Sequence, residues 1–284
     1  MRFGASLESL APRVLEGGRA ELAAVLADVA AALRACGLDL VEFPLDALLV
    51  YPAILTPDAL ALIRSHADAH GFGFGAHLPY MWLDLAALNE DIRRASVSAV
   101  VGAAELARPL APAHYTLHPV GERLGSLARS AWTQRERDYF RGRMLERSRR
   151  SLEEIAAAIG RDRLYVENLE SLPAEVAFDV AVDAGLGLCL DTGHALLQGE
   201  DPAHLLARHG DRVGVVHLHD VRREGGALCD HRPLGSGILD LSTLRRALEE
   251  ARFQGTMVLE MNDLSDTRAS VQALRVFRQR RQSR

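Results

Sequence analysis

Short apolar runs alternate with amphipathic helical stretches along the whole of this 284-residue chain. Each run has the length and composition of a buried strand, and the residues after it repeat their apolar positions at helical spacing. The expected strands are Phe3–Ser6, Leu38–Phe43, Gly73–His77, His114–His118, Leu164–Asn168, Gly187–Leu190, Gly214–His217 and Met257–Glu260. The expected helices are Ala20–Cys36, Pro57–Ala69, Asn89–Ala107, Thr133–Ile159, Ala174–Ala184, Pro202–His209, Ser242–Ala251 and Thr267–Gln279. This rhythm favours a parallel sheet covered by helices.

Eight such units predict an α/β fold, a single (β/α)8 TIM barrel formed by residues 1–284 as one domain. An open, doubly wound sheet is the main competitor. It is disfavoured because the units are even and no Gly-rich phosphate turn follows the first strand. Hydrophobic residues make up 48% of the chain, which is ample for a barrel core.

Composition excludes several functions. The chain contains no lysine, so Schiff-base chemistry and a P-loop lysine are unavailable. A net charge of -5 makes nucleic acid an unlikely partner. Cys36, Cys189 and Cys229 are too few and too irregularly spaced for a disulfide framework, and no signal pattern or membrane-length apolar run occurs. We therefore expect a cytoplasmic protein with no membrane partner.

One stretch, at about residues 121–150 after the fourth expected strand, carries nine arginines against four acids. One interpretation is a solvated helix face. The other is a loop and helix that reach over the barrel mouth and meet an anionic small-molecule substrate.

Polar side chains end six successive expected strands. In TIM barrels the carboxyl ends of the strands and the loops after them form the reactive face. The residues concerned are His77, His118, Glu167, Asn168, Asp191, His194, His217, His219, Asp220, Asp230, His231, Arg232 and Glu260. Any one of them alone is weak evidence, since strand-end histidines are often structural. Glu42, on the second expected strand, is interpreted as a substrate contact or, preferably, as the structural partner of an arginine.

Together these groups predict a divalent-metal site. Crowding three carboxylates without cations raises their pKa values at a real energetic cost, and a cation removes that cost. The mixture of His, Asp and Glu suits Zn²⁺ or Mn²⁺, with Fe²⁺ also compatible, rather than Ca²⁺. Within the seventh strand we assign His217 as the ligand, because the strand is ending at His219 and its alternation no longer holds there.

The segments Leu190–His194 (LDTGH), Val216–Asp220 (VHLHD) and Asp230–Gly235 (DHRPLG) resemble the xylose-isomerase-like barrel superfamily, and the resemblance spans essentially the whole chain. That superfamily contains sugar isomerases and epimerases as well as endonuclease IV-like phosphodiesterases. Its isomerases imply one metal held by the residues matching Glu167, Asp191, His217 and Glu260. The same resemblance implies that Glu167 and Glu260 are the paired catalytic acid and base.

The endonuclease IV-like branch implies up to three metals, held in addition by the residues matching His77, His118, His194 and His231. All four are present, and this favours a multinuclear phosphodiesterase over a one-metal isomerase or epimerase, which is the alternative. One departure concerns Cys229, which stands where that branch has an Asp; Asp230 lies one residue out of register. Either the thiolate substitutes, the neighbour reaches in, or the third metal is weak or absent.

The chain from the fourth strand onward also resembles a family of cobamide-remodelling phosphodiesterases, on segments including Asp191–Asp201 and Leu259–Ser265. The leading hypothesis is thus a metal-dependent phosphodiesterase with one to three ions and a small or cofactor-sized substrate, which the resemblance suggests is a cobamide. DNA repair is less favoured. A barrel without activity that only binds a ligand is a third hypothesis. Arg232, His219 and Asn168 are the candidate substrate contacts, with Arg232 reaching a phosphate.

Overall fold

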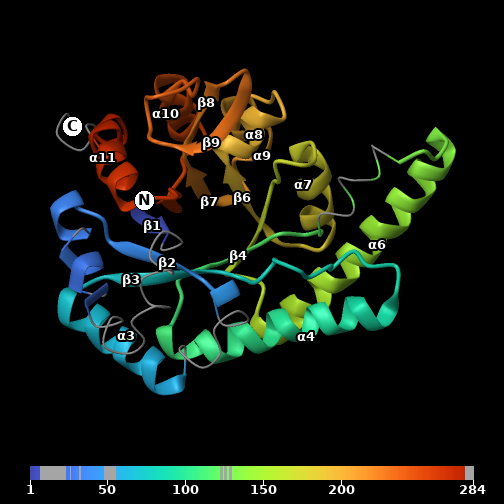
Figure 1. Ribbon diagram of the computed structural model, residues 1–284, viewed down its shortest axis with the longest axis horizontal. Coiled ribbons are helices and arrows are strands. Elements are labelled where there is room, and N and C mark those ends of the chain that lie inside the picture. Colours follow the sequence, from blue (N-terminus) through green and yellow to red (C-terminus); the bar gives the residue numbers. More distant parts are fainter. Residues whose placement is uncertain are drawn as a thin grey trace.

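The structure is a computed structural model that describes residues 1–6, 24–25, 27–31, 33–47, 56–121, 124, 127 and 130–278. Its parallel strands close into a barrel in the order β1-β10-β7-β6-β5-β4-β3-β2, which confirms the predicted fold (Figure 1). The strands are β1 (Arg2–Ser6), β2 (Leu40–Pro44), β3 (Gly73–His77), β4 (Tyr115–Leu117), β5 (Leu164–Glu167), β6 (Gly187–Asp191), β7 (Val213–Leu218) and β10 (Thr256–Leu259). Each predicted strand is present to within two residues at either end.

Helices surround this barrel (Figure 1). They are α3 (Pro57–His70), α4 (Glu90–Ala107), α6 (Gln134–Ile159), α7 (Ala174–Asp183), α8 (Thr192–Leu197), α9 (Pro202–His209), α10 (Leu241–Glu250) and α11 (Leu264–Arg278), with a 3-10 turn η2 at Arg108–Leu110. Several begin at a side chain that accepts a backbone N–H, as Asn89 does for α4 and Thr133 does in the capping box of α6. Of the predicted helix Ala20–Cys36, the described residues between 24 and 36 are helical, and the rest lies outside the described residues.

The barrel interior is filled by apolar side chains and one aromatic ring. Leu40, Cys189, Val215 and Val258 are fully buried there and pack against Tyr165. The Tyr165 ring occupies the space in which a side chain at Gly214 would stand, since a Cβ there would lie 2.1 Å from the ring. The interior is therefore a packed core, and the polar groups concentrate at the carboxyl ends of the strands.

An antiparallel hairpin follows β7 and was not predicted. It consists of β8 (Asp220–Glu224) and β9 (Ala227–Arg232), joined through Gly225 and Gly226. Both glycines have positive φ, 57° and 92°, as a tight two-residue hairpin turn requires. The Asp220 carboxylate holds the base of the hairpin by accepting four backbone N–H groups at 2.8 to 3.0 Å, those of Val221, Gly235, Gly237 and Leu239.

The arginine-rich stretch lies largely on α6, whose first half projects away from the barrel (Figure 1). Several of its arginines pair with acids of the helices themselves. Arg147 donates to Glu90 of α4 at 2.9 Å, and Arg149 donates to Glu153 one turn along α6. These contacts support the interpretation as a solvated helix face. Among the described residues, no helix is both long enough and apolar enough to cross a membrane.

Candidate metal centre

Four acidic and imidazole side chains converge where β5, β6, β7 and β10 end. Glu167, Asp191, His217 and Glu260 place their ligating atoms within 4.8 Å of one another, and all four side chains are buried. His217 Nδ1 lies 3.0 Å from Glu167 Oε1, 3.1 Å from Glu260 Oε2 and 3.9 Å from Asp191 Oδ2. The structure thus brings together the four residues that the sequence assigns to a first cation.

A second group shares Glu167 with the first. His77 Nε2 lies 3.1 Å from Glu167 Oε2, and His118 Nε2 lies 3.4 Å from the same oxygen. The His77 ring is held from behind, because its Nδ1 lies 3.0 Å from the carbonyl oxygen of Leu78 and so donates to it. Tyr80, which the sequence reading missed, packs its ring on that of His118 with centroids 4.0 Å apart. Each oxygen of Glu167 therefore faces a different set of imidazoles.

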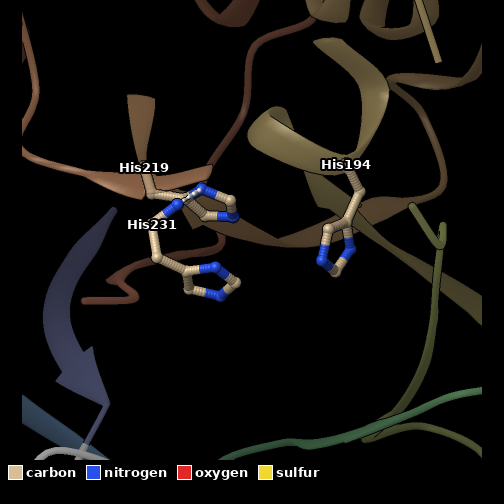
Figure 2. A group of neighbouring side chains, drawn as sticks. All are labelled: His194, His219 and His231. Carbon is tan, nitrogen blue, oxygen red and sulfur yellow. Dashed lines mark hydrogen bonds between the residues drawn. The ribbon is translucent and has the colours of Figure 1, made fainter. Parts of the chain in front are cut away.

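A third group consists of His194, His219 and His231 (Figure 2), and His194 Nδ1 lies 3.7 Å from Asp191 Oδ1 of the first group. His219 and His231 stack with centroids 4.2 Å apart, and the His194 ring stands opposite them. His219 already uses both ring nitrogens. Its Nδ1 accepts the backbone N–H of His231 at 2.9 Å, so its Nε2 carries the proton and donates to Asp191 Oδ2 at 3.0 Å. His219 therefore orients Asp191 and the hairpin rather than presenting a free ligand atom.

The hairpin supplies the other candidate ligands of this third group. His231 has φ +52°, a left-handed conformation that breaks the alternation of β9, so the neighbouring residues Asp230 and His231 both line the pocket. Asp230 Oδ1 lies 3.3 Å from His231 Nδ1. Cys229 is not among the residues that line this pocket. Of the alternatives that the sequence leaves open, the geometry favours Asp230 reaching in beside His194 and His231.

Proximity of opposite charges shifts the pKa values of these groups strongly. Although burial alone lowers it, the hydrogen bond with Glu167 and the charge of that carboxylate raise the pKa of His77 to about 10. Burial alone would also lower the pKa of His194, but the charges of Asp191 and Glu167 outweigh that effect and raise this pKa to about 9. Burial raises the pKa of Glu167, but His217 and the other imidazoles around it hold that pKa well below its usual range.

Several observations show that these residues fit divalent cations. Glu260 Oε2 is buried without a hydrogen-bond partner among the described residues. Buried polar atoms without partners are rare unless something else binds them. Carboxylates and imidazoles in this ratio match Zn²⁺, Mn²⁺ or Fe²⁺. Cys189 also lies within reach of Glu167 and His217, but burial raises the pKa of its thiol, which disfavours the thiolate that a metal requires.

We expect cation binding to release protons and to tighten as the pH rises from 6 to 9. The raised pKa values, about 10 for His77 and about 9 for His231, mean that these imidazoles are protonated in the metal-free protein below pH 9. A cation must displace those protons. Calorimetric titration of the metal-free protein with Zn²⁺ in buffers of different ionisation enthalpy measures the proton count. A heat of binding that does not depend on the buffer would contradict the prediction.

The mouth above these groups is a cavity of about 790 Å³. Its floor carries the charged residues, and one wall is apolar because Tyr80, Met81, Trp82 and Leu83 of the β3–α4 loop line it. Trp82 is 82% exposed and has φ +59°, which is uncommon for a bulky residue. Glu170 and Asn262 also line the mouth. The sequence gives one indication of this wall, because its residues follow closely after the strand that ends in His77.

The predicted substrate contacts lie elsewhere. His219 and Asn168 are fully buried, and the Asn168 side chain bonds the backbone of Asp191 through both its oxygen and its nitrogen. Arg232 donates to Glu224 across the hairpin at 2.9 Å. None of the three is among the described residues that line the mouth.

Comparisons with known proteins agree with the barrel fold. Residues 30–280 match the family described as Xylose isomerase-like TIM barrel. Probable endonuclease 4 of Mycobacterium leprae is 26% identical over 205 residues, covering 66% of this chain and 75% of that protein. Inosose dehydratase of Geobacillus thermodenitrificans is 32% identical over 89 residues, but these cover only 26% of this chain and 30% of that protein.

Solved structures resemble the chain over nearly its whole length. A D-tagatose 3-epimerase-like protein has a TM-score of 0.74 at 19% identity, with 98% of this chain and 97% of that one covered. D-psicose 3-epimerase from Clostridium cellulolyticum has a TM-score of 0.71 at 16% identity, with 98% of each chain covered. Epimerase names predominate among these structures, so they stand closer to the isomerase alternative than to a phosphodiesterase. With the barrel, the buried ligand clusters and a match over residues 30–280, the chain belongs to the xylose isomerase-like TIM barrel family.

Proposed function

We propose that this chain is a divalent-metal-dependent phosphodiesterase acting on a small or cofactor-sized anionic substrate. The observation that carries the proposal is the position of Glu167. Its Oε1 lies 3.0 Å from His217, and its Oε2 lies 3.1 Å from His77 and 3.4 Å from His118. Glu167 could therefore serve both ligand groups, and two cations held there would supply the chemistry that metal-dependent hydrolysis of a phosphoester uses.

In this proposal one cation would be held by Glu167, Asp191, His217 and Glu260, a second by His77 and His118 with Glu167, and a third by His194, His231 and Asp230. Divalent cations held there would supply Lewis-acid stabilisation of a phosphoester's oxygens and would lower the pKa of a water. The residues of the chain keep these groups in place, and the apolar wall at Trp82 covers the less polar part of the substrate. Cobamides are the first phosphodiesters to test, because of the sequence resemblance described above.

The second candidate is a sugar or sugar phosphate isomerase or epimerase, and two observations favour it. Glu167 and Glu260 both lie about 3 Å from His217 Nδ1, as a pair that moves a proton at a carbon next to a carbonyl would. Two solved structures that match over 98% of the chain carry epimerase in their names. Against it, Oε2 of Glu167 is covered by two imidazoles, whereas a proton-transferring base needs an open oxygen.

Metal content separates the two candidates. The protein, purified without a His tag, is analysed for Zn, Mn and Fe per chain. We expect about two to three equivalents if the proposal holds. A single equivalent supports the isomerase or epimerase, and the screen then turns to ketoses and to solvent deuterium in the product.

The variants His77→Ala and His118→Ala give an independent test. Under the proposal each lowers turnover of the phosphodiester at least about 100-fold, because one cation loses a ligand that nothing replaces. Turnover is measured with bis-p-nitrophenyl phosphate and with cobamides. The exposed His70→Ala variant on α3 is the control. Full turnover in both variants would show that the second cation group is not part of the reaction.

A further inference from the structure

A fully buried carboxylate lies on the inner side of the metal centre. Glu42, on β2, is 1% exposed, and its ion-pair partners among the described residues are histidines rather than the arginine that the sequence suggests. Its Oε1 lies 3.0 Å from His217 Nε2, and its Oε2 lies 2.5 Å from His114 Nε2. Thr116 donates a long hydrogen bond to the same Oε2, at 3.5 Å. Two imidazoles therefore compensate this buried charge, and one of them belongs to a ligand residue.

The two nitrogens of His217 consequently face different groups. Nδ1 faces Glu167, Glu260 and Asp191, whereas Nε2 lies 3.0 Å from Oε1 of Glu42. His217 Nε2 and Glu42 Oε1 lie 3.0 Å apart, but neither atom has a hydrogen bond of good geometry with any described residue, whereas Nδ1 bonds Glu167 Oε1 at 3.0 Å. A neutral imidazole donates from one nitrogen and offers a lone pair at the other. With a cation on the side of Glu167, Glu260 and Asp191, the nearby carboxylate of Glu42 favours the proton on Nε2 and leaves the lone pair on Nδ1 for the cation.

His114 holds Glu42 from below. It precedes β4, is 2% exposed, and its ring occupies the space beside Gly75, where a Cβ would lie 2.4 Å from the ring. The same ring lines a cavity at the opposite end of the barrel from the metal centre, together with Arg2, Arg163 and Tyr165. A side chain larger than hydrogen at position 75 would displace His114 and, with it, Glu42.

We infer that Glu42 is a positioning residue that makes His217 a cation ligand through Nδ1, and that His114 locks Glu42 in place. The inference goes beyond the proposed function, because it concerns the cation centre that both candidate reactions use. Glu42 is buried and is not among the described residues that line the mouth, so it acts on the cation centre through His217 rather than on the substrate.

The direct test is histidine-ring nitrogen NMR of the protein with and without Zn²⁺. We expect one buried imidazole, assigned to His217 by its loss in His217→Gln, that keeps its proton on Nε2 and changes at Nδ1 when Zn²⁺ binds. Coordination through Nε2 would overturn the inference. This readout uses the unaltered chain, so it does not depend on whether a variant folds.

Variants give the second arm. Glu42→Leu is expected to weaken Zn²⁺ binding 10- to 100-fold, the usual cost of losing a group that orients a ligating His. Glu42→Gln keeps one oxygen that can accept from Nε2 and should recover part of that loss. His114→Gln should fall between them. The control is Glu105→Leu, the same chemical change on the exposed end of α4, with affinity as in the wild type.

Zn²⁺ affinity measured by competition with a chelator needs no substrate, so the result is separate from the fate of the proposed reaction. If Glu42→Leu binds Zn²⁺ as tightly as the wild type, Glu42 does not position His217 and the inference fails. If affinity falls as expected but no phosphodiester is turned over by the wild type, only the proposed function fails.

Discussion

Glu167→Gln should remove both cation binding and about 10³-fold or more of the turnover, the largest functional effect of any single change in this chain. Glu167 belongs to three of the four groups of described residues that can hold an ion. Glutamine keeps the shape of the side chain, but it replaces one carboxylate oxygen with an NH2 group and removes the negative charge. Two cation positions then lose a negative ligand at once, whereas any other substitution affects one.

The measurement is metal content by elemental analysis together with turnover of the substrate found in the screen. Glu170→Gln is the matched control, because this carboxylate also lines the mouth but is half exposed and lies 3.7 Å from His194. We expect that variant to keep its metals. If Glu167→Gln still binds a full equivalent of cation at each position, Glu167 does not serve both ligand groups.

Arg93→Ala should lower the free energy of unfolding by about 3 kcal/mol, the largest effect on stability that a surface-helix substitution produces here. Arg93 is 0% exposed, although α4 lies on the outside of the barrel. Its guanidinium donates to both oxygens of Glu90, to Glu154 and to Ser151 of α6, at 2.9 to 3.0 Å. Alanine removes these contacts and the packing of the arginine stem.

Arg94→Ala is the control for this prediction. It is the next residue, pairs with the same Glu90 at 3.0 Å, but has a side chain 65% exposed. Exposed ion pairs contribute roughly 0 to 1 kcal/mol, so this variant should unfold close to the wild type. Urea denaturation followed by circular dichroism compares the two midpoints. Equal midpoints would show that the buried guanidinium does not hold α4 to α6.

Much of the barrel can be predicted because its signals are local. Strand β3 runs from Gly73 to His77 as expected, and α9 runs from Pro202 to His209, bounded by an Asp cap and a Pro at its first turn. The hairpin β8–β9 was missed although Gly225-Gly226 is a recognised turn pair, because its strands are polar and lack alternating apolar residues.

The partners of individual side chains were less predictable because they depend on tertiary contacts. Arg93 occupies the buried stripe of α4 together with Ser96, Val97 and Val100, where a helical pattern expects an apolar residue. The partners of Glu42 come from the residue before β4 and from β7, which are distant from it in sequence. The register of Asp230 follows from a left-handed backbone at His231, which neither composition nor spacing reveals.

The anchoring of the hairpin by Asp220 makes it a tolerant site for new sequence. Four backbone N–H groups around one buried carboxylate fasten the chain where it leaves the barrel and where it returns. The turn at Gly225 and Gly226 lies beyond that fastening, and a Cβ added at either would meet nothing within 4 Å. Residues can therefore be inserted at the tip to lengthen the loop while Asp220 keeps both ends of the hairpin in place.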